Sequence, residues 1–133
     1  MSDNIVKDNQ RIVHMYEALK CLNEQASGLA FEEMAFQNMR TAAILHYLTI
    51  LGEAANRMSK EFCEEHPDIP WREIAGLRHR LVHDYFEVEY EKVWYVLQND
   101  LPSLREQITA LYNALPEDPE LPDNLAEFED EES

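Results

Sequence analysis

One short stretch, residues 78–85, holds most of the side chains in this chain that could do chemistry. It reads Arg-His-Arg-Leu-Val-His-Asp-Tyr and comes two residues after Gly76. An imidazole can accept or donate a proton near neutral pH, and a guanidinium can bind a phosphate through paired donors. Together they suit a metal-independent phosphoryl transfer in which a ribose 2′-hydroxyl attacks the adjacent phosphate and leaves a 2′,3′-cyclic end. DNA lacks that hydroxyl and is not expected to react.

The spacing of these residues sets a geometric condition. An ideal helix advances about 100° per residue, so Arg78 and His83 would lie about 140° apart, whereas His79 and His83 would share a face and Arg78 and Tyr85 would nearly align. A single regular helix would therefore not direct Arg78 and His83 at one atom. They could converge if the helix bends near the end of the stretch, or if a two-fold dimer brings two copies of the stretch together.

Each residue also has a structural interpretation. Arg78 and Arg80 could be solvated surface charges, His83 a buried imidazole with one hydrogen bond, and Tyr85 a core or interface aromatic. His79 and His83, four residues apart, could instead bind a metal together with the neighbouring aspartate. No strong third ligand is adjacent, so that signal is weak. We expect no metal and no cofactor.

The rest of the chain predicts an all-α fold, a bundle of four or five helices. Apolar residues recur at three-to-four spacing, only three glycines occur, and no stretch favours a strand pair. We expect a first helix over about 3–25 and a long helical stretch over 31–58 with a bend at Gly52. A connector over 64–70 should follow, and then a helix from Pro70 that is capped by Asp68 and continues into residues 78–85. A further helix should end near Asp100, and the last should start at Pro102. Residues 1–115 are expected to form one domain, and 116–133 a disordered acidic tail.

Charge and composition limit the possible functions. The formal net charge is −16, and nine of the acidic residues lie between Glu117 and Ser133, which leaves −7 on the remaining body. Any nucleic-acid contact must then be local, around Arg78 and Arg80. Cys21 and Cys63 show no metal or disulfide spacing, and neither a signal sequence nor an apolar run of about 20 residues is present. We therefore expect a cytoplasmic protein without a membrane segment.

Three segments together resemble the HepT-like family of the HEPN superfamily. They are 48–57, with Leu-Thr-Ile-Leu-Gly-Glu-Ala-Ala-Asn-Arg, 69–78, with Ile-Pro-Trp-Arg-Glu-Ile-Ala-Gly-Leu-Arg, and 82–86, with Val-His-Asp-Tyr-Phe. The resemblance implies a homodimeric helical bundle with Arg78 and His83 at a composite ribonuclease site between protomers. His79 occupies a slot where asparagine or aspartate is more usual. Glu53, in the Gly-Glu-Ala segment, is expected to support the site by pairing with an arginine.

The same resemblance implies a partner. HepT-like toxins are paired with an MNT-type nucleotidyltransferase antitoxin, in a type VII-like toxin-antitoxin system, and the antitoxin adenylylates the motif tyrosine, here Tyr85. Added bulk and negative charge beside Arg78 and His83 would keep out RNA phosphate, whether of tRNA or mRNA. The two proteins could form a larger complex. The alternative is a non-catalytic subunit that presents substrate to a separate nucleotidyltransferase; the net acidity favours it, whereas retention of Arg78 and His83 favours catalysis.

Overall fold

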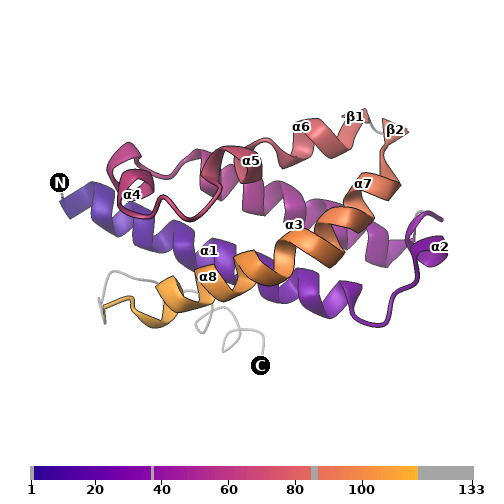
Figure 1. Cartoon of the computed structure of the whole chain (residues 1–133), viewed down its shortest axis with the longest axis horizontal. Helices are drawn as coiled ribbons and strands as arrows, with labels where there is room; N and C mark the ends of the chain where they lie inside the picture. The colour runs from indigo at the N-terminus through magenta and orange to yellow at the C-terminus, as the bar shows by residue number, and fades with distance from the viewer. Residues whose placement is uncertain (1, 37, 85–86, 117–133) are drawn as a thin grey trace, which may run out of the picture.

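Three long helices form the frame of the molecule. The computed structural model describes residues 2–36, 38–84 and 87–116. Helix α1 (Ser2–Ala26) packs along α3 (Met39–Asn56), and α8 (Leu101–Asn113) lies against α1 (Figure 1). The shorter elements lie over this frame, above α3 in the view of Figure 1 and at its two ends. The expectation of an all-α bundle is confirmed.

The core consists of aliphatic side chains from all three long helices and from the segments that connect them. Because these residues recur every three or four positions, each helix presents one apolar stripe to the others. The largest side chains with almost no exposure are Ile12, Met15, Leu22, Met34, Ile44, Leu51, Leu81, Val93 and Ile108.

The end of α1 is fixed by a glycine and an arginine. Gly28 has a φ of 71°, in the left-handed region that glycine adopts without strain. The Arg40 guanidinium donates from Nη2 to the carbonyl oxygens of Gln25 at 2.6 Å and Ser27 at 2.9 Å. Carbonyls at the end of α1, which have no partner within the helix, are thereby satisfied by α3.

The expected single helical stretch over 31–58 is wrong. It is divided into α2 (Phe31–Met34) and α3, because Asn38 caps α3 by accepting a hydrogen bond from the Thr41 amide at 2.9 Å. At Gly52, where a bend was expected, α3 continues without a break to Asn56. Gly52 instead permits a close approach: a Cβ there would lie 3.0 Å from the carbonyl oxygen of Ile74.

The connector expected after residue 64 is confirmed from His66 to Pro70, but a short helix, α4 (Lys60–Glu65), precedes it. Ser59 caps α4, and the buried Asp8 carboxylate on α1 accepts hydrogen bonds from the Ser59 amide at 2.8 Å and hydroxyl at 2.5 Å. The expected Asp68 cap is wrong, because Pro70 holds the cap position of the next helix and no side-chain cap is present there.

The second half of the chain ends in one long helical rod. Helix α7 (Tyr90–Tyr95) passes through a π-helical turn (Val96–Asp100) directly into α8. Pro102, in the first turn of α8, has no amide hydrogen, so the helical hydrogen-bond ladder must be interrupted near this point. The expected separate helices, one ending near Asp100 and one starting at Pro102, are thus continuous.

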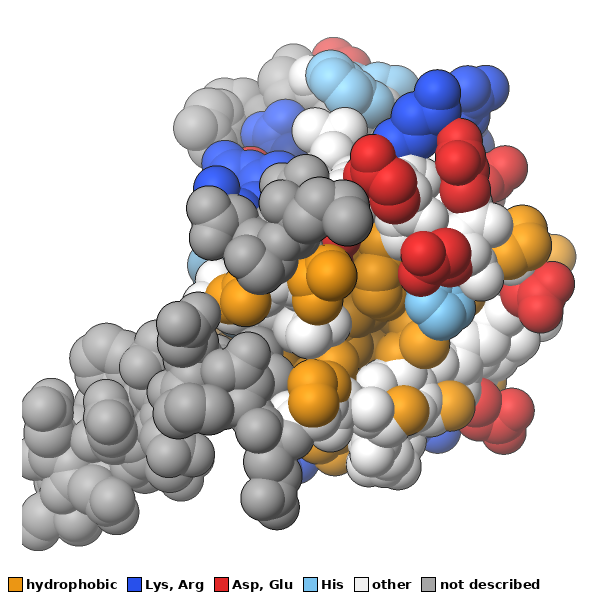
Figure 2. Space-filling view, turned by 90° about the vertical axis from the view of Figure 1, so that its left-hand side faces the viewer, with side chains coloured by type: hydrophobic (Ala, Val, Ile, Leu, Met, Phe, Trp, Pro, Cys, Tyr) orange, Lys and Arg blue, Asp and Glu red, His pale blue; other side chains and the backbone are white. Residues whose placement is uncertain are grey.

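Figure 2 shows the end of the molecule at which α1 begins. Hydrophobic side chains line a hollow there, acidic side chains lie along one border of it, and most of the Lys and Arg side chains on this face lie higher up. None of the described helices combines the length and apolar character that a membrane span needs. The predicted acidic tail lies, from residue 117 on, outside the described residues.

Candidate active site on the α6–β2 segment

Two consecutive short helices present the arginine-rich part of the predicted cluster. Helix α5 (Trp71–Ala75) is followed by Gly76 and then by α6 (Leu77–Leu81). Leu77 and Leu81, four residues apart, are buried, whereas all three residues between them, 78–80, are exposed. The two leucines therefore anchor α6 and leave its polar side chains accessible.

The helix ends before His83, which corrects the assumption of one regular helix through the cluster. Strand β1 (Val82–Asp84) follows α6 and pairs antiparallel with β2 (Glu87–Val88), although no strand pair was predicted. Val82 pairs with Val88 and Asp84 with Glu87, so the register shifts between them and His83 is the extra residue of a bulge. Bulges redirect side chains and recur beside active sites.

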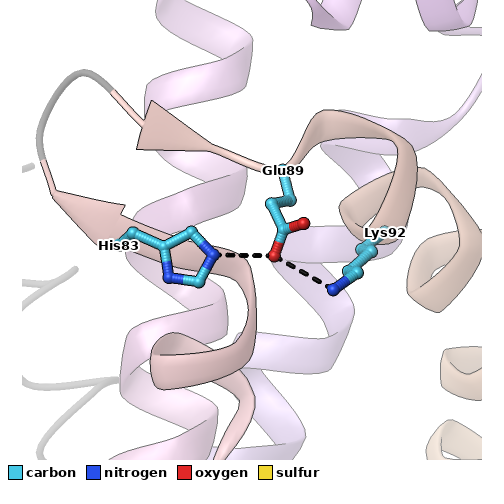
Figure 3. Close-up of polar contacts among 3 residues, drawn as sticks. All are labelled: His83, Glu89 and Lys92. Atoms are coloured by element: carbon cyan, nitrogen blue, oxygen red, sulfur yellow. Dashed lines mark hydrogen bonds and ion pairs between the residues drawn. The ribbon is translucent and has the colours of Figure 1, made fainter.

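The hairpin places His83 against a carboxylate that the sequence did not single out. His83 Nε2 lies 2.8 Å from Glu89 Oε2, and Lys92 Nζ donates to the same oxygen at 3.1 Å (Figure 3). Glu89 comes directly after β2, and its amide donates to the carbonyl oxygen of Leu81 at 2.8 Å, which fixes its position relative to β1. The three side chains form a linear array on the surface, with 52% of the His83 side chain exposed.

The charges in this array determine which imidazole nitrogen is available. Hydrogen bonds from Lys92, first, and from His83 lower the pKa of the Glu89 carboxyl below its ordinary value. An ionised carboxylate can accept but not donate, so Nε2 of His83 must carry the hydrogen in the 2.8 Å contact. In the neutral ring, Nδ1 then holds the free lone pair. His83 is thus oriented as a proton acceptor, and Glu89 would stabilise the imidazolium that forms.

The other predicted site residues are distributed over several surfaces. Arg78 and His79 project from α6 and form no side-chain hydrogen bond or ion pair within the described part of the chain. Arg80 lines a cavity of about 390 Å³ between α5, α6 and the start of α8. Arg78 and His83 form no hydrogen bond with each other among the described residues. Tyr85 lies outside the described residues.

Glu53 lies elsewhere than expected. It is exposed on α3 and lines a hollow between α1 and α3, and no ion pair with an arginine is formed among the residues that the structure describes. The neighbouring Gly52, by contrast, lies against the carbonyl oxygens that lead into α6. The Gly-Glu-Ala segment therefore contributes to the site region through its glycine, which lets α5 approach α3.

The structure does not place His79 and His83 on one helical face, as the metal-binding alternative requires. His79 is on α6 and His83 is on β1, so the two imidazoles do not stack one helical turn apart. Within the described ranges, no group of three or more His, Cys, Asp or Glu side chains is placed to hold a metal ion.

Sequence reasoning missed Glu89 and Lys92. Their spacing, three residues apart at the start of α7, is a common ion-pair spacing on helices and gave no sign of a link to His83. The link depends on the hairpin, which reverses the chain between His83 and Glu89. A strand of three residues and one of two are too short to be detected by alternation of apolar and polar residues.

Known proteins match the chain over most of its described length. The family model for "Ribonuclease HepT-like" matches residues 15–111. The chain is 37% identical over 95 residues to "Putative RNase TTE0752" of Caldanaerobacter subterraneus subsp. tengcongensis, which covers 71% of this chain and 85% of that protein. It is 34% identical over 95 residues, 71% of this chain and 86% of the relative, to "Probable ribonuclease HepT" of Thermococcus cleftensis.

A third relative, "Putative RNase MJ1380" of Methanocaldococcus jannaschii, is 30% identical over 97 residues, 71% of this chain and 89% of that protein. No solved structure matches the chain. The family match includes α3, the α6–β2 segment and most of α8. This chain is therefore a member of the HepT-like ribonuclease family of HEPN proteins.

Proposed function

We propose that this chain is a metal-independent endoribonuclease toxin, in which Arg78 and His83 are the catalytic residues. The observation that carries the proposal is the hydrogen bond between His83 and Glu89, because it leaves Nδ1 of His83 free to accept a proton. The names of the relatives, RNase and ribonuclease, support an RNA substrate. We propose tRNA or mRNA as this substrate, and the cytoplasm as the place of action.

The reaction requires one base, one acid and one group that stabilises charge. His83 Nδ1 accepts the proton of the ribose 2′-hydroxyl, whose oxygen forms a bond to the adjacent phosphorus. The bond from phosphorus to the 5′-oxygen breaks, and that oxygen receives a proton from an imidazolium. The exposed Arg78 guanidinium stabilises the negative charge that accumulates on the phosphorane oxygens.

A homodimer would supply the second imidazole and the second guanidinium that one protomer lacks. A single chain contributes only one oriented imidazole, and its Arg78 forms no hydrogen bond with His83 in the described residues. A two-fold interface across the α6–β2 segment would bring two arginines and two histidines to one phosphate. One His83 would then serve as the base and the other as the acid.

Regulation is proposed to act on Tyr85, in the stretch between β1 and β2. An MNT-type nucleotidyltransferase antitoxin would transfer adenylate from ATP to the phenol oxygen and release pyrophosphate, alone or within a larger toxin-antitoxin complex. The added phosphate would repel RNA phosphate from the site that Arg78 and His83 are proposed to form. A Tyr85→Phe protein should gain no adenylate mass when incubated with antitoxin and ATP and should remain active; modification of this variant would exclude Tyr85 as the switch.

The second candidate is a non-catalytic subunit that presents substrate to a separate nucleotidyltransferase. The formal charge of −16 favours it, since such a role needs no extended contact with RNA. The orientation of His83 by Glu89 has no function under that role.

Cleavage of total RNA and purified tRNA in excess EDTA distinguishes the two candidates. The protein should first be shown by mass to carry no adenylate, and His83→Ala should be assayed beside it. Persistent cutting with cyclic-phosphate ends that is lost in His83→Ala supports the toxin. Absence of cutting by the unmodified protein supports the substrate-presenting subunit.

A further inference from the structure

A second group of basic side chains lies between α1 and α3, away from the α6–β2 segment. A hollow of about 220 Å³ there is lined by Lys7, Arg11 and His14 from α1 and by Glu53 and Arg57 from α3. Three cations therefore face one carboxylate, in a chain with eleven Lys and Arg against twenty-seven acids. Positive charge at this density is unusual for the molecule and marks a specific place on its surface.

The cations in this hollow, named here the α1–α3 groove, are not neutralised by nearby acids. None of Lys7, Arg11 and Arg57 forms an ion pair within the part of the chain that the structure describes, and Glu53 forms none with them. Lys7 and Arg57 are exposed, and Arg11 is half-buried. Side chains of this kind retain hydrogen-bond donors for an external anion.

The groove has the geometry of a helix-to-helix surface rather than of a structural ion-pair network. Lys7, Arg11 and His14 follow one another at spacings of four and three along α1, so they form one row. Arg57 lies opposite them at the end of α3, where it is the C-cap residue. Cations on both sides of a groove suit an extended anion with several charges.

We propose that the α1–α3 groove binds the sugar-phosphate backbone of the RNA, away from the phosphate that is cleaved. This inference rests on the proposed ribonuclease function, and it assigns the groove to substrate affinity rather than to chemistry. Because the molecule as a whole carries a net charge of −16, RNA should bind only where positive charge is local, and the groove and the α6–β2 segment are two such places.

The groove and the site lie at different places along the molecule. The groove is near the start of α1 and the end of α3, whereas His83 is on β1, which lies toward the opposite end of the molecule (Figure 1). We therefore expect only an RNA of several nucleotides to contact both places, and a dinucleotide bound at His83 not to reach the groove.

The test is a binding measurement that needs no cleavage. The probe is a fluorescein-labelled oligonucleotide of about 16 nucleotides, within the site sizes of single-strand binders, with every ribose 2′-O-methylated so that it cannot react. Full-length protein and the double variant Arg11→Glu with Arg57→Glu are compared by anisotropy at several salt concentrations. We expect about tenfold weaker binding or more, and a salt-dependence slope lower by about 0.7 for each phosphate that is no longer neutralised.

Two further variants make the result specific. Lys20→Glu reverses one charge on the same helix, where the double variant reverses two. Lys20 is exposed and does not line the groove, so the affinity of this variant should remain near that of the unaltered protein except for a small general effect. Glu53→Gln removes the one carboxylate of the groove and should tighten binding, a change that partial unfolding could not produce. An equal reduction of affinity in the groove double variant and in Lys20→Glu would overturn the proposal.

A cleavage arm separates this proposal from the ribonuclease proposal. The double variant should raise KM for a long RNA and leave the cleavage of a dinucleotide unchanged. If the protein binds the methylated probe through the groove but cuts no RNA, the groove assignment stands and the ribonuclease proposal fails. If it cuts RNA but the double variant binds normally, the groove proposal fails. If the effect of the double variant disappears when residues 117–133 are removed, the groove contacts the acidic tail and the RNA assignment is overturned.

Discussion

The α1–α3 pair and the α6–β2 segment differ in the regularity of their backbone and in the burial of their side chains. Along α1 and α3 the helices are regular and the side chains toward the core are almost fully buried, as Ile12, Ile44 and Leu51 are. The α6–β2 segment changes from helix to strand and reverses within a short length, and the side chains that could react there are exposed. We therefore expect stability to depend mainly on the regular region and the proposed reaction on the irregular one.

This division has a physical cause. A regular helix places polar side chains on its outer face at fixed angles, which makes convergence of two of them on one atom difficult. The end of α6 and the bulge at His83 remove that restriction, and the buried Leu77 and Leu81 hold the segment in place. Substitutions in the two regions should therefore have effects of different kinds.

The strongest test of the comparison is His83→Ala, with Arg78→Ala beside it. Each should reduce RNA cleavage by about 10²-fold or more, because a positioned acid or base contributes roughly 10²–10⁴ and a charge-stabilising donor about 10²–10³. The melting temperature should change little, since both side chains are exposed. His46→Ala, an exposed histidine on α3, is the matched control. A large fall in melting temperature would show that the segment also carries stability.

The converse substitution is Leu51→Ala in the regular region. Leu51 is fully buried, so the variant should lose about 2–5 kcal/mol of unfolding free energy, because less apolar surface is buried and a cavity remains. Denaturant unfolding measures this loss. At a temperature where the variant remains folded, the cleavage rate should be near that of the unaltered protein. A loss of cleavage without a loss of stability would contradict the division.

A smaller effect is expected for Glu89→Gln. The amide is nearly isosteric, but it cannot carry the negative charge that fixes the tautomer of His83 and stabilises its imidazolium. Cleavage should fall by roughly tenfold, less than for removal of His83, because Glu89 acts through its neighbour. The cleavage rate should also be measured for the double variant Glu89→Gln with His83→Ala. If Glu89 acts through His83, Glu89→Gln should cause little further loss once His83 is removed. An equal loss in both backgrounds would exclude this positioning role.

The smallest expected effect is on the Glu89 carboxyl itself. Lys92→Met removes the hydrogen bond that contributes most to lowering the pKa of the Glu89 carboxyl, ahead of the one from His83. The pKa should therefore rise toward its ordinary value, and by more than in His83→Ala. Carboxyl NMR titration measures both shifts. Because the folded pKa is lowered, the stabilisation from the Glu89 hydrogen bonds is complete above the ordinary carboxyl pKa and disappears as pH falls through the folded value. A larger rise in His83→Ala than in Lys92→Met would reverse the order of the causes.

The sequence predicted the regular region better than the irregular one. The three-to-four spacing of apolar residues identified α1 and α8 closely, because one buried stripe per helix leaves a periodic pattern. Gly52 was associated with a bend, whereas the structure shows that it lets α5 approach α3 closely. Asn38, which divides α2 from α3, was passed over because a capping residue does not interrupt the apolar pattern.

The site was predicted in its residues and not in its geometry. Arg78 and His83 were identified by type and spacing, and their roles stay predictions. The partner of His83 could not be found in this way, because Glu89 reaches it only through a hairpin whose strands are too short to leave a pattern. Glu53 was assigned to an arginine partner by its place in the motif, whereas its position depends on which face of α3 meets α1.

The register of the hairpin has a consequence for how this site could change over time. Since Val82 pairs with Val88 and Asp84 with Glu87, the ladder does not use His83, and the fold would keep both pairs with almost any residue in its place. We therefore expect natural variation at this position to be limited by the proposed function more than by folding. A lineage that no longer needed the reaction could lose it by one codon change and retain the bundle intact.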